Sequence, residues 1–377
     1  MPPPRPAVLF VSVPTGIGGS TRSLANVLSY LAGDAERILA GPAQGRFVEL
    51  VDRERLAERR LAIISHRPRF RPLRRAWASV RLAVFTVGHR RRLTAIHANG
   101  LKELSVALPA ALLGRVPLVV WVHNFLLPPS VRLLGGVWRR LLPHGDVRWA
   151  AVSPLARDLV VDAGLVAPDD VVIVPNPIDP ADVLAPERSD HEPVTVAFLG
   201  SPREYKGFQF LPEIIEAVAA TSSGPVEWLV FSRQTDDHLA ATWNRLREME
   251  AAGGGRLSIE GKFTDVRAAY ARCDVVVCPS VLDSFCRVAA EAMLNGLPVV
   301  GSDLPPIRDL LGDDDAGLLV PSGDIEATAK AVARLVDDPD LRSRLGATGR
   351  ARAAAFSPGR VRSQLLERYG IRDRELA

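Results

Sequence analysis

The chain has 377 residues, too many for one ordinary hydrophobic core and enough for two domains of typical size. Hydrophobic residues make up 47% of it and charged residues 24%, which excludes a disordered or fibrous protein. Lys and Arg (47) exceed Asp and Glu (43) by a formal net charge of +4, too little to indicate nucleic-acid binding. We therefore expect no nucleic-acid partner.

The N-terminal segment 1–13 carries one Arg and a short apolar run before a Gly-rich turn, which predicts a first strand rather than a signal peptide. The most apolar stretch, 106–127, is interrupted by charged residues and proline, so no transmembrane helix is expected. Three cysteines at 273, 278 and 286 match no zinc or redox spacing and predict reduced thiols in the cytoplasm.

Short apolar runs rich in β-branched residues alternate with longer amphipathic stretches, the pattern of βαβ units. The first half predicts strands at 7–13, 36–40, 61–64, 94–97, 117–121, 147–152 and 170–174. A proline-rich, polar stretch at 175–190 then indicates a linker. The second half predicts strands at 194–200, 226–231, 256–260, 274–278, 298–301 and 317–320. We predict an α/β fold of two Rossmann-like, doubly wound domains facing a cleft, residues 1–183 and 184–355.

The first candidate loop is Gly-rich and follows the first predicted strand, before a helix predicted at 21–32. Ligands on such sheets bind beyond the carboxyl ends of strands, and glycines let the backbone approach them closely. Gly18 and Gly19 are therefore candidate ligand contacts. Thr21 stands where a dinucleotide fingerprint needs glycine, and no Gly-Lys-Ser/Thr follows, which excludes a P-loop. A tight turn without a ligand is the alternative.

The second candidate loop opens the second domain and precedes a helix predicted at 207–220. Lys206 is one of four lysines in the chain, and its ammonium could reach a diphosphate from this loop. Arg203 could add a second cation. The alternative is a solvated loop lysine.

The third feature is the segment from Cys278 to Asp303. A buried strand ends at Pro279, the loop carries Asp283, and a helix beginning near residue 285 carries Glu291 about two turns in. The two carboxylates can hold different parts of one ligand, such as the hydroxyls of a sugar and of a ribose. Asp283 could alternatively be only a helix N-cap.

The segment 274–303 resembles the donor-binding signature of glycosyltransferase family four, a retaining group with the GT-B fold. The shared pattern is Pro-Ser, an acidic pair spaced around Phe, Glu-Ala-Met, Gly-x-Pro-Val-Val and Ser-Asp. The likeness continues into 317–324 and reaches back to Lys206-Gly207, Asn176 and the Gly18-Gly19 loop. It covers nearly the whole chain.

The resemblance implies a role for each matching residue. Glu291 would bind the ribose hydroxyls of the donor, Asp283 the hydroxyls of its sugar, and Lys206 its diphosphate. The resemblance places Gly19 close to the donor and His123 in the sugar pocket. The backbone N–H groups that would meet the sugar and diphosphate belong to Phe285, Cys286, Arg287 and Val288.

Three positions depart from the family pattern. Asp283 replaces Glu and shortens the reach of the carboxylate by one methylene. We therefore expect the donor sugar to sit differently or to be of a different kind. Ser201, in the donor-binding loop with Gly200, stands where the family usually has an arginine, and Arg203 could compensate. Cys286 occupies the usual glycine position.

A leaving diphosphate needs its growing charge stabilised, and no Asp-x-Asp follows a strand. We expect Lys206, Arg203 and helix N-termini to do this without a metal, and Asp313–Asp315 to form a solvated turn. The resemblance implies a retaining, hexosyltransferase-type enzyme, and we expect no cofactor besides its nucleotide-diphosphate sugar substrate.

The acceptor is predicted from the first domain, where the segment 66–92 is Arg-rich and apolar. The resemblance also implies that the C-terminal helix, within residues 356–377, crosses back to this domain. A basic amphipathic helix with aromatic residues favours an anionic membrane surface. We therefore predict a peripheral enzyme of the inner membrane face that assembles an envelope polysaccharide or glycolipid. The alternatives are an ordinary packed helix in a soluble enzyme that glycosylates a small natural product, a non-catalytic nucleotide-sugar sensor, a sugar-nucleotide epimerase and, least favoured, a nicotinamide oxidoreductase.

Overall fold

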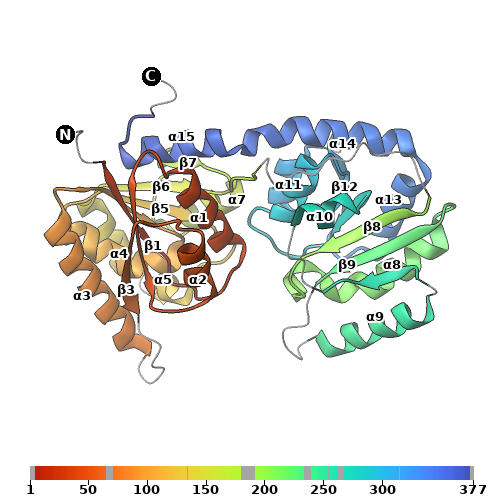
Figure 1. Ribbon diagram of the computed structural model, residues 1–377, viewed down its shortest axis with the longest axis horizontal. Coiled ribbons are helices and arrows are strands. Elements are labelled where there is room, and N and C mark those ends of the chain that lie inside the picture. The colour runs from red at the N-terminus through yellow and green to blue at the C-terminus, as the bar shows by residue number, and fades with distance from the viewer. Residues whose placement is uncertain are drawn as a thin grey trace. The chain divides into compact units, whose positions relative to one another are not determined.

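The structure is a computed structural model that describes residues 5–64, 71–133, 135–179, 192–232, 239–253, 255–261, 266–313 and 315–373. The chain forms two compact units (Figure 1). The first unit combines Met1–Pro177 with Pro358–Ala377, and the second is Ile178–Ser357. The domain boundary predicted between residues 183 and 184 lies outside the described residues.

The first unit is built on a parallel sheet of seven strands in the order β3-β2-β1-β4-β5-β6-β7. The strands are β1 (Ala7–Val11), β2 (Glu36–Pro42), β3 (Arg59–Ile64), β4 (Leu93–Ala98), β5 (Leu118–Val122), β6 (Val147–Ala151) and β7 (Val171–Ile173). Every residue of β1 and β5 is buried, because parallel sheets are covered on both faces. This explains why these strands read as continuous apolar runs.

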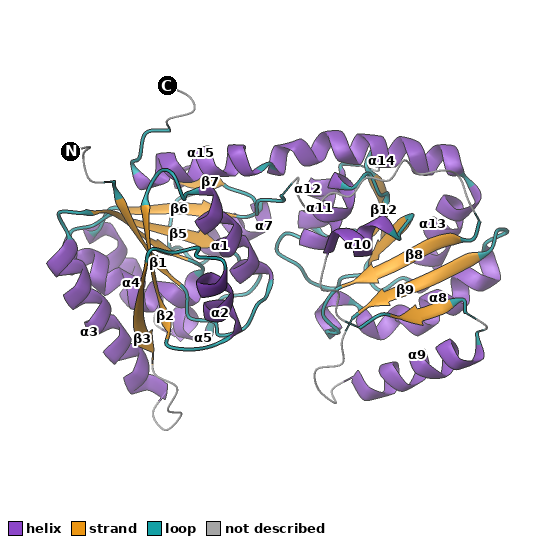
Figure 2. Cartoon of the chain, viewed as in Figure 1, coloured by secondary structure: helices purple, strands orange, loops and turns teal. Residues whose placement is uncertain are grey.

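Helices cover both sides of this sheet (Figure 2). They are α1 (Gly19–Tyr30), α2 (Arg46–Arg53), α3 (Arg71–His89), α4 (Leu101–Gly114), α5 (Pro129–Leu133), α6 (Gly135–Leu141), α7 (Pro154–Asp162) and α15 (Pro358–Tyr369). Helix α3 packs against α4, and α15 packs against α1. None of the helices within the described ranges combines the length and the apolar character that crossing a membrane requires.

Buried polar contacts attach α15 to the rest of the first unit. Arg362 donates two hydrogen bonds of 2.8 Å to the buried carboxylate of Asp34, and a third to Asp373. The Tyr369 hydroxyl lies 2.8 Å from Nδ1 of His97. Because burial lowers the pKa of His97 to about 3, its ring is neutral at physiological pH. The C-terminal helix is therefore an integral part of the first unit.

The second unit contains a parallel sheet of six strands in the order β10-β9-β8-β11-β12-β13. The strands are β8 (Val194–Leu199), β9 (Val226–Phe231), β10 (Leu257–Ile259), β11 (Val275–Cys278), β12 (Val299–Ser302) and β13 (Gly317–Val320). The helices are α8 (Leu211–Thr221), α9 (Ala240–Ala252), α10 (Val266–Ala271), α11 (Arg287–Leu294), α12 (Pro305–Leu311), α13 (Ile325–Asp337) and α14 (Pro339–Ala353). The predicted fold class, two Rossmann-like α/β domains, is confirmed.

One predicted helix start was wrong. The sequence predicts a helix from residue 207, but α8 begins at Leu211 after two short 3₁₀ turns. Gly207 separates those turns in a left-handed conformation with φ of +72°. A Cβ at this position would lie 1.8 Å from the carbonyl oxygen of Pro279, so only glycine fits. The close approach of another loop therefore delays the helix.

Candidate functional site

The centre of the candidate site is an ion pair between two loops of the second unit. Lys206 follows β8 and Asp283 follows β11, and these strands are neighbours in the sheet. Nζ of Lys206 donates to Oδ2 of Asp283 at 2.5 Å, and Asp283 is only 7% exposed. The carboxyl ends of parallel strands meet at one edge, which brings these distant residues together.

Each charge of this pair stabilises the other. Burial works to raise the pKa of Asp283, but the Lys206 ammonium and backbone N–H donors outweigh it and lower that pKa. Burial likewise works to lower the pKa of Lys206, and the Asp283 carboxylate reverses the effect and raises it. Both groups are therefore ionised at neutral pH.

Backbone hydrogen bonds fix the positions of the two loops relative to each other. The N–H groups of Val281 and Leu282 donate to the carbonyl of Tyr205 at 2.9 and 3.0 Å. Oδ1 of Asp283 accepts from the N–H of Ser284 at 2.8 Å. The ion pair is thus fixed by the fold of both loops rather than by two flexible side chains alone.

The N-terminus of α11 lies directly after this loop. Cys286 is the N-cap residue, and its φ of +56° is left-handed, a conformation that glycine adopts more easily than other residues. A hydrogen bond with Cys278, together with burial, raises the pKa of the Cys286 thiol, so the side chain is neutral. Helix first-turn N–H groups have no intrahelical partner and attract anions. The backbone of Arg287 and Val288 therefore offers donors next to the ion pair.

Glu291 lies one turn into α11 rather than the predicted two, because α11 begins at Arg287 and not near residue 285. Both of its carboxylate oxygens accept hydrogen bonds. Oε1 accepts from Nη2 of Arg287 at 2.9 Å, and Oε2 accepts from the hydroxyl of Tyr270 at 2.9 Å. The sequence interpretation missed both contacts. The four-residue spacing of Arg287 and Glu291 could have indicated the first, but no sequence signal connects Tyr270, on α10, to Glu291.

The other predicted donor-binding residues of the second unit lie around this centre. Gly200, with φ of +155°, and the exposed Ser201 begin the loop after β8. Arg203 lies in the same loop as Lys206 and is exposed. Phe285 is buried, with its ring edge-on to that of Phe356 at 5.6 Å between centroids. These residues share one sheet edge with the ion pair, and their assigned roles stay predictions.

Three predicted residues belong to the first unit. Gly18 is the N-cap of α1, and its N–H donates to the Thr21 hydroxyl at 2.8 Å. Thr21, the residue that breaks the dinucleotide fingerprint, therefore closes this loop. A Cβ on Gly18 would meet nothing within 4 Å, so space is open beside Gly18. His123 follows β5, and its ring is edge-on to Trp121 at 4.3 Å.

The first unit also contains a buried carboxyl that the sequence interpretation did not identify. Glu103, on α4, is buried, and its Oε1 accepts from the N–H of Val13 at 3.0 Å. Asn124 accepts from the N–H of Leu101 at 3.1 Å. These two side chains join the loops that follow β1, β4 and β5. Burial raises the pKa of Glu103 to about 7 despite the Val13 donor and nearby cations.

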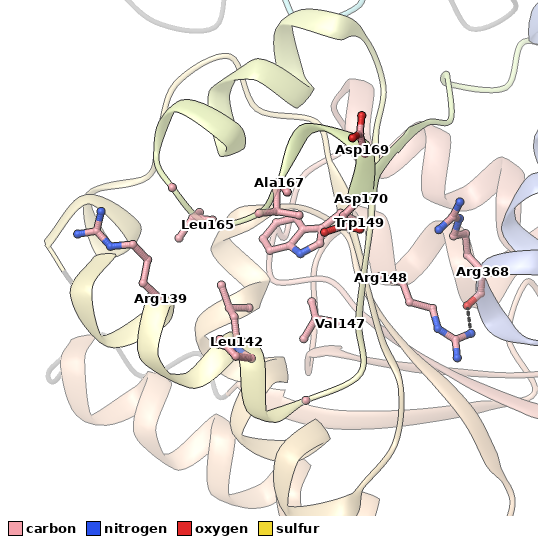
Figure 3. A pocket seen from close by; sticks show the side chains of 14 residues that line it. Arg139, Leu142, Val147, Arg148, Trp149, Leu165, Ala167, Asp169, Asp170 and Arg368 are labelled. Atoms are coloured by element: carbon pink, nitrogen blue, oxygen red, sulfur yellow. Dashed lines mark hydrogen bonds between the residues drawn. The ribbon is translucent and has the colours of Figure 1, made fainter.

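A cavity of about 690 Å³ in the first unit is separate from these residues (Figure 3). It is lined by the beginning of β6, including Val147 and Arg148, and by residues before β7 such as Asp169. Arg148 there donates to the backbone carbonyl of Arg368 at 2.7 Å. None of the predicted site residues lines the cavity. It lies at the amino ends of strands, whereas the candidate loops follow carboxyl ends.

Within the described ranges, no group of three or more His, Cys, Asp or Glu side chains could hold a metal ion. Asp313, from the acidic turn, pairs with Arg308 at 2.7 Å. The prediction of metal-free chemistry stays a prediction.

Known proteins resemble both units in sequence. Residues 17–182 match the protein family described as "Glycosyltransferase Family 4", and residues 193–338 match the family described as "Glycosyl transferases group 1". The chain is 30% identical over 292 residues to alpha-maltose-1-phosphate synthase of Mycolicibacterium smegmatis, covering 69% of this chain and 74% of that protein. The chain belongs to glycosyltransferase family four. The resemblance inferred from the donor-binding signature is confirmed.

Two further comparisons show the range of this glycosyltransferase family. Phosphatidyl-myo-inositol mannosyltransferase of Mycolicibacterium smegmatis is 33% identical over 228 residues, 58% of this chain and 56% of that protein. The chain thus spans little more than half the length of this relative. The crystal structure of Anabaena HepE in complex with UDP and glucose has a TM-score of 0.77 at 19% identity, covering 96% of this chain and 99% of that one. This likeness shows the shared GT-B fold.

Proposed function

We propose that this family member transfers a sugar from a nucleotide-diphosphate sugar to a hydroxyl group of an acceptor. The observation that carries the proposal is the buried ion pair of Lys206 and Asp283 beside the N-terminus of α11, with Glu291 one turn further. A cation and helix N–H donors suit a diphosphate, and carboxylates suit sugar and ribose hydroxyls. A relative named as a mannosyltransferase and a neighbour bound to UDP and glucose support the same reading.

In this mechanism the bond between the anomeric carbon and the β-phosphate oxygen breaks while the acceptor oxygen bonds to the anomeric carbon on the same face. Because the new bond forms on the face from which the old one leaves, the anomeric configuration is retained. The acceptor proton passes to the departing phosphate. Lys206 stabilises the negative charge that develops on the leaving diphosphate. Asp283 holds a sugar hydroxyl, which the remaining acceptor position on Oδ2 allows without breaking the contact to Lys206. The mechanism requires no metal ion.

The test is transfer by Lys206→Ala with a panel of nucleotide-diphosphate sugars and glycolipid, sugar and small-molecule acceptors. We expect kcat to fall by about 100-fold or more, the size typical of losing a key electrostatic donor. Lys330→Ala, which removes a lysine from an exposed pair with Glu326, is the matched control and should keep full activity. Normal turnover by Lys206→Ala would contradict the proposal. Donor binding without transfer or hydrolysis by the wild type would favour the sensor.

We infer that the protein binds an anionic membrane surface and meets its acceptor there, because α3 presents an apolar stripe to solvent. Trp77, Val80, Val84 and Val87 follow a 3-4-3 spacing on one helix face, and Trp77 and Val84 are 63% and 70% exposed. The exposed Arg81 lies on the same face. Such a face suits the interface of an anionic bilayer. Residues 66–70 of the predicted basic segment lie outside the described residues.

This inference favours envelope polysaccharide or glycolipid assembly, with the protein peripheral on the inner face of the membrane. The name of the phosphatidyl-myo-inositol mannosyltransferase, a lipid-modifying relative, supports a lipid-linked acceptor. A small natural product is the acceptor class to expect if the stripe does not bind lipid.

A further inference from the structure

The carboxylate of Glu291 is held by two donors that come from different elements. Nη2 of Arg287 lies one turn earlier on α11, and the hydroxyl of Tyr270 comes from α10. Tyr270 is fully buried, and its hydroxyl also lies 3.3 Å from the carbonyl of Val288. The Arg287 and Glu291 side chains are 12% and 13% exposed. Each oxygen of Glu291 therefore has its own fixed donor, and the carboxylate plane is set by both.

This arrangement leaves Glu291 with acceptor capacity. An ionised carboxylate offers about four lone-pair positions, two on each oxygen. Tyr270 and Arg287 each use one, on different oxygens. One position on each oxygen thus remains, and the Glu291 side chain is partly exposed. Two acceptor oxygens on one carboxylate suit the two hydroxyls of a vicinal diol.

We propose that Tyr270 and Arg287 are positioning residues that orient Glu291 for the vicinal ribose hydroxyls of the donor nucleotide, and that they thereby select ribonucleotides over 2′-deoxyribonucleotides. The proposal rests on the proposed function, since it requires a nucleotide donor at this edge of the sheet. Burial and the Glu291 carboxylate raise the pKa of Tyr270, so its hydroxyl keeps its proton and remains a donor at neutral pH. A 2′-deoxyribose lacks one of the two hydroxyls and leaves one oxygen of Glu291 without its partner.

The test is isothermal titration calorimetry with UDP, GDP, ADP and CDP, and then with the 2′-deoxy form of the nucleotide that binds most tightly. We expect the wild type to prefer the ribonucleotide by about tenfold or more, because hydrogen bonds to charged groups are strong. Tyr270→Phe and Arg287→Met should each reduce this ratio several-fold by weakening ribonucleotide binding alone. In transfer assays the same variants should raise the donor KM and leave kcat within about twofold, as expected for loss of uniform binding.

Matched controls separate positioning from stability. Tyr369→Phe removes the hydroxyl of another fully buried tyrosine, and Arg272→Met breaks another arginine–glutamate pair of the second unit. Both should keep the wild-type ratio, whatever their effect on melting temperature. Arg287→Lys should recover part of the ratio that Arg287→Met loses.

The outcomes distinguish failure of the positioning role from failure of the proposed function. If Glu291→Gln abolishes the preference while Tyr270→Phe and Arg287→Met keep it, Glu291 binds the ribose but the positioning role is wrong. If the wild type binds ribo- and deoxyribonucleotides equally, the ribose contact itself is wrong and the positioning role falls with it. If no nucleotide binds at all, the proposed function fails.

Discussion

The two units share a fold plan but differ in what they present to their surroundings. Nine of the eleven large hydrophobic residues that are exposed among those described belong to the first unit, including the α3 stripe, Leu113 on α4 and Leu133 on α5. The two in the second unit, Tyr205 and Val281, lie in the loops that carry the ion pair. Exposed apolar patches mark surfaces for partners. Among the described residues, the first unit thus exposes most of the large apolar side chains, whereas the second unit carries the Lys206–Asp283 ion pair.

Buried titratable groups near the carboxyl ends of the strands also differ between the two units. In the second unit, Lys206 and Asp283 are both charged and stabilise each other. In the first unit, burial lowers the pKa of His97 and raises that of Glu103, so both neutral forms are favoured. The first unit does contain a buried ion pair, Arg362 with Asp34, so the contrast is between these particular groups and not between the two sheets as a whole. The difference follows from whether a counter-ion lies within hydrogen-bond distance.

The largest expected effect comes from breaking the ion pair of Lys206 and Asp283 in the second unit. Asp283→Asn leaves Lys206 without its counter-ion and removes the predicted sugar contact. We expect kcat/KM to fall about 1000-fold and the second unit to lose about 2 kcal/mol of stability, less than for a fully buried pair because Lys206 is partly exposed. Steady-state kinetics and urea denaturation measure both. Asp313→Asn, which alters an exposed pair, is the control, and near-normal kinetics in Asp283→Asn would refute the assignment.

The next effect tests whether Glu103 is held neutral. Its folded pKa of about 7 lies above the ordinary value of 4.5, so its protonated form favours folding and that contribution is lost as pH rises from 4.5 to 7. Glu103→Gln keeps an acceptor for Val13 and does not titrate. We expect its stability advantage over the wild type to grow by about 3 kcal/mol between pH 4.5 and pH 8. Urea midpoints across this range measure it, and a constant difference would show that Glu103 titrates normally.

A smaller effect concerns the exposed apolar stripe of α3 in the first unit. Replacing Trp77 and Val84 by Ser should reduce sedimentation with vesicles of phosphatidylglycerol and phosphatidylcholine about tenfold, because both side chains are exposed and can enter the bilayer interface. Stability should change by no more than about 0.5 kcal/mol. Serines at Val281 and Tyr205, the exposed apolar residues of the second unit, provide the control. Unchanged binding in the α3 variant, or no binding by the wild type at low salt, removes the membrane from the proposal.

The smallest effect tests the left-handed residue at the start of α11. Cys286→Gly relieves a strained φ, worth about 1 kcal/mol, but removes a buried thiol of comparable value. We expect a net change within about 1 kcal/mol by thermal denaturation. Cys286→Val, with a β-branched side chain that this φ excludes, should cost about 2 kcal/mol or more. Equal stabilities of the Gly and Val variants would show that the conformation is unstrained.

Much of the charged site could be predicted from the sequence. Buried parallel strands read as apolar runs, so the ends of β8 and β11 were clear, and with them the loops that carry Lys206 and Asp283. The sequence placed Asp283 in the loop after β11 and Glu291 on the helix that follows it. These inferences depend on residues close together in sequence, where local patterns are informative.

Other features depend on residues far apart in sequence, and only the tertiary structure decided them. Glu103 meets the N–H of Val13 across 90 positions, and Tyr270 meets Glu291 across 21. The start of α8 depends on the Pro279 carbonyl against Gly207. Likewise, amphipathicity located α3, but its packing on α4 decided that Leu82 is buried and Val84 exposed. The sequence by itself determined the strands, the fold class and the principal charged loops, because these follow from short-range periodicity. Packing between elements decided the partners and protonation of each buried group.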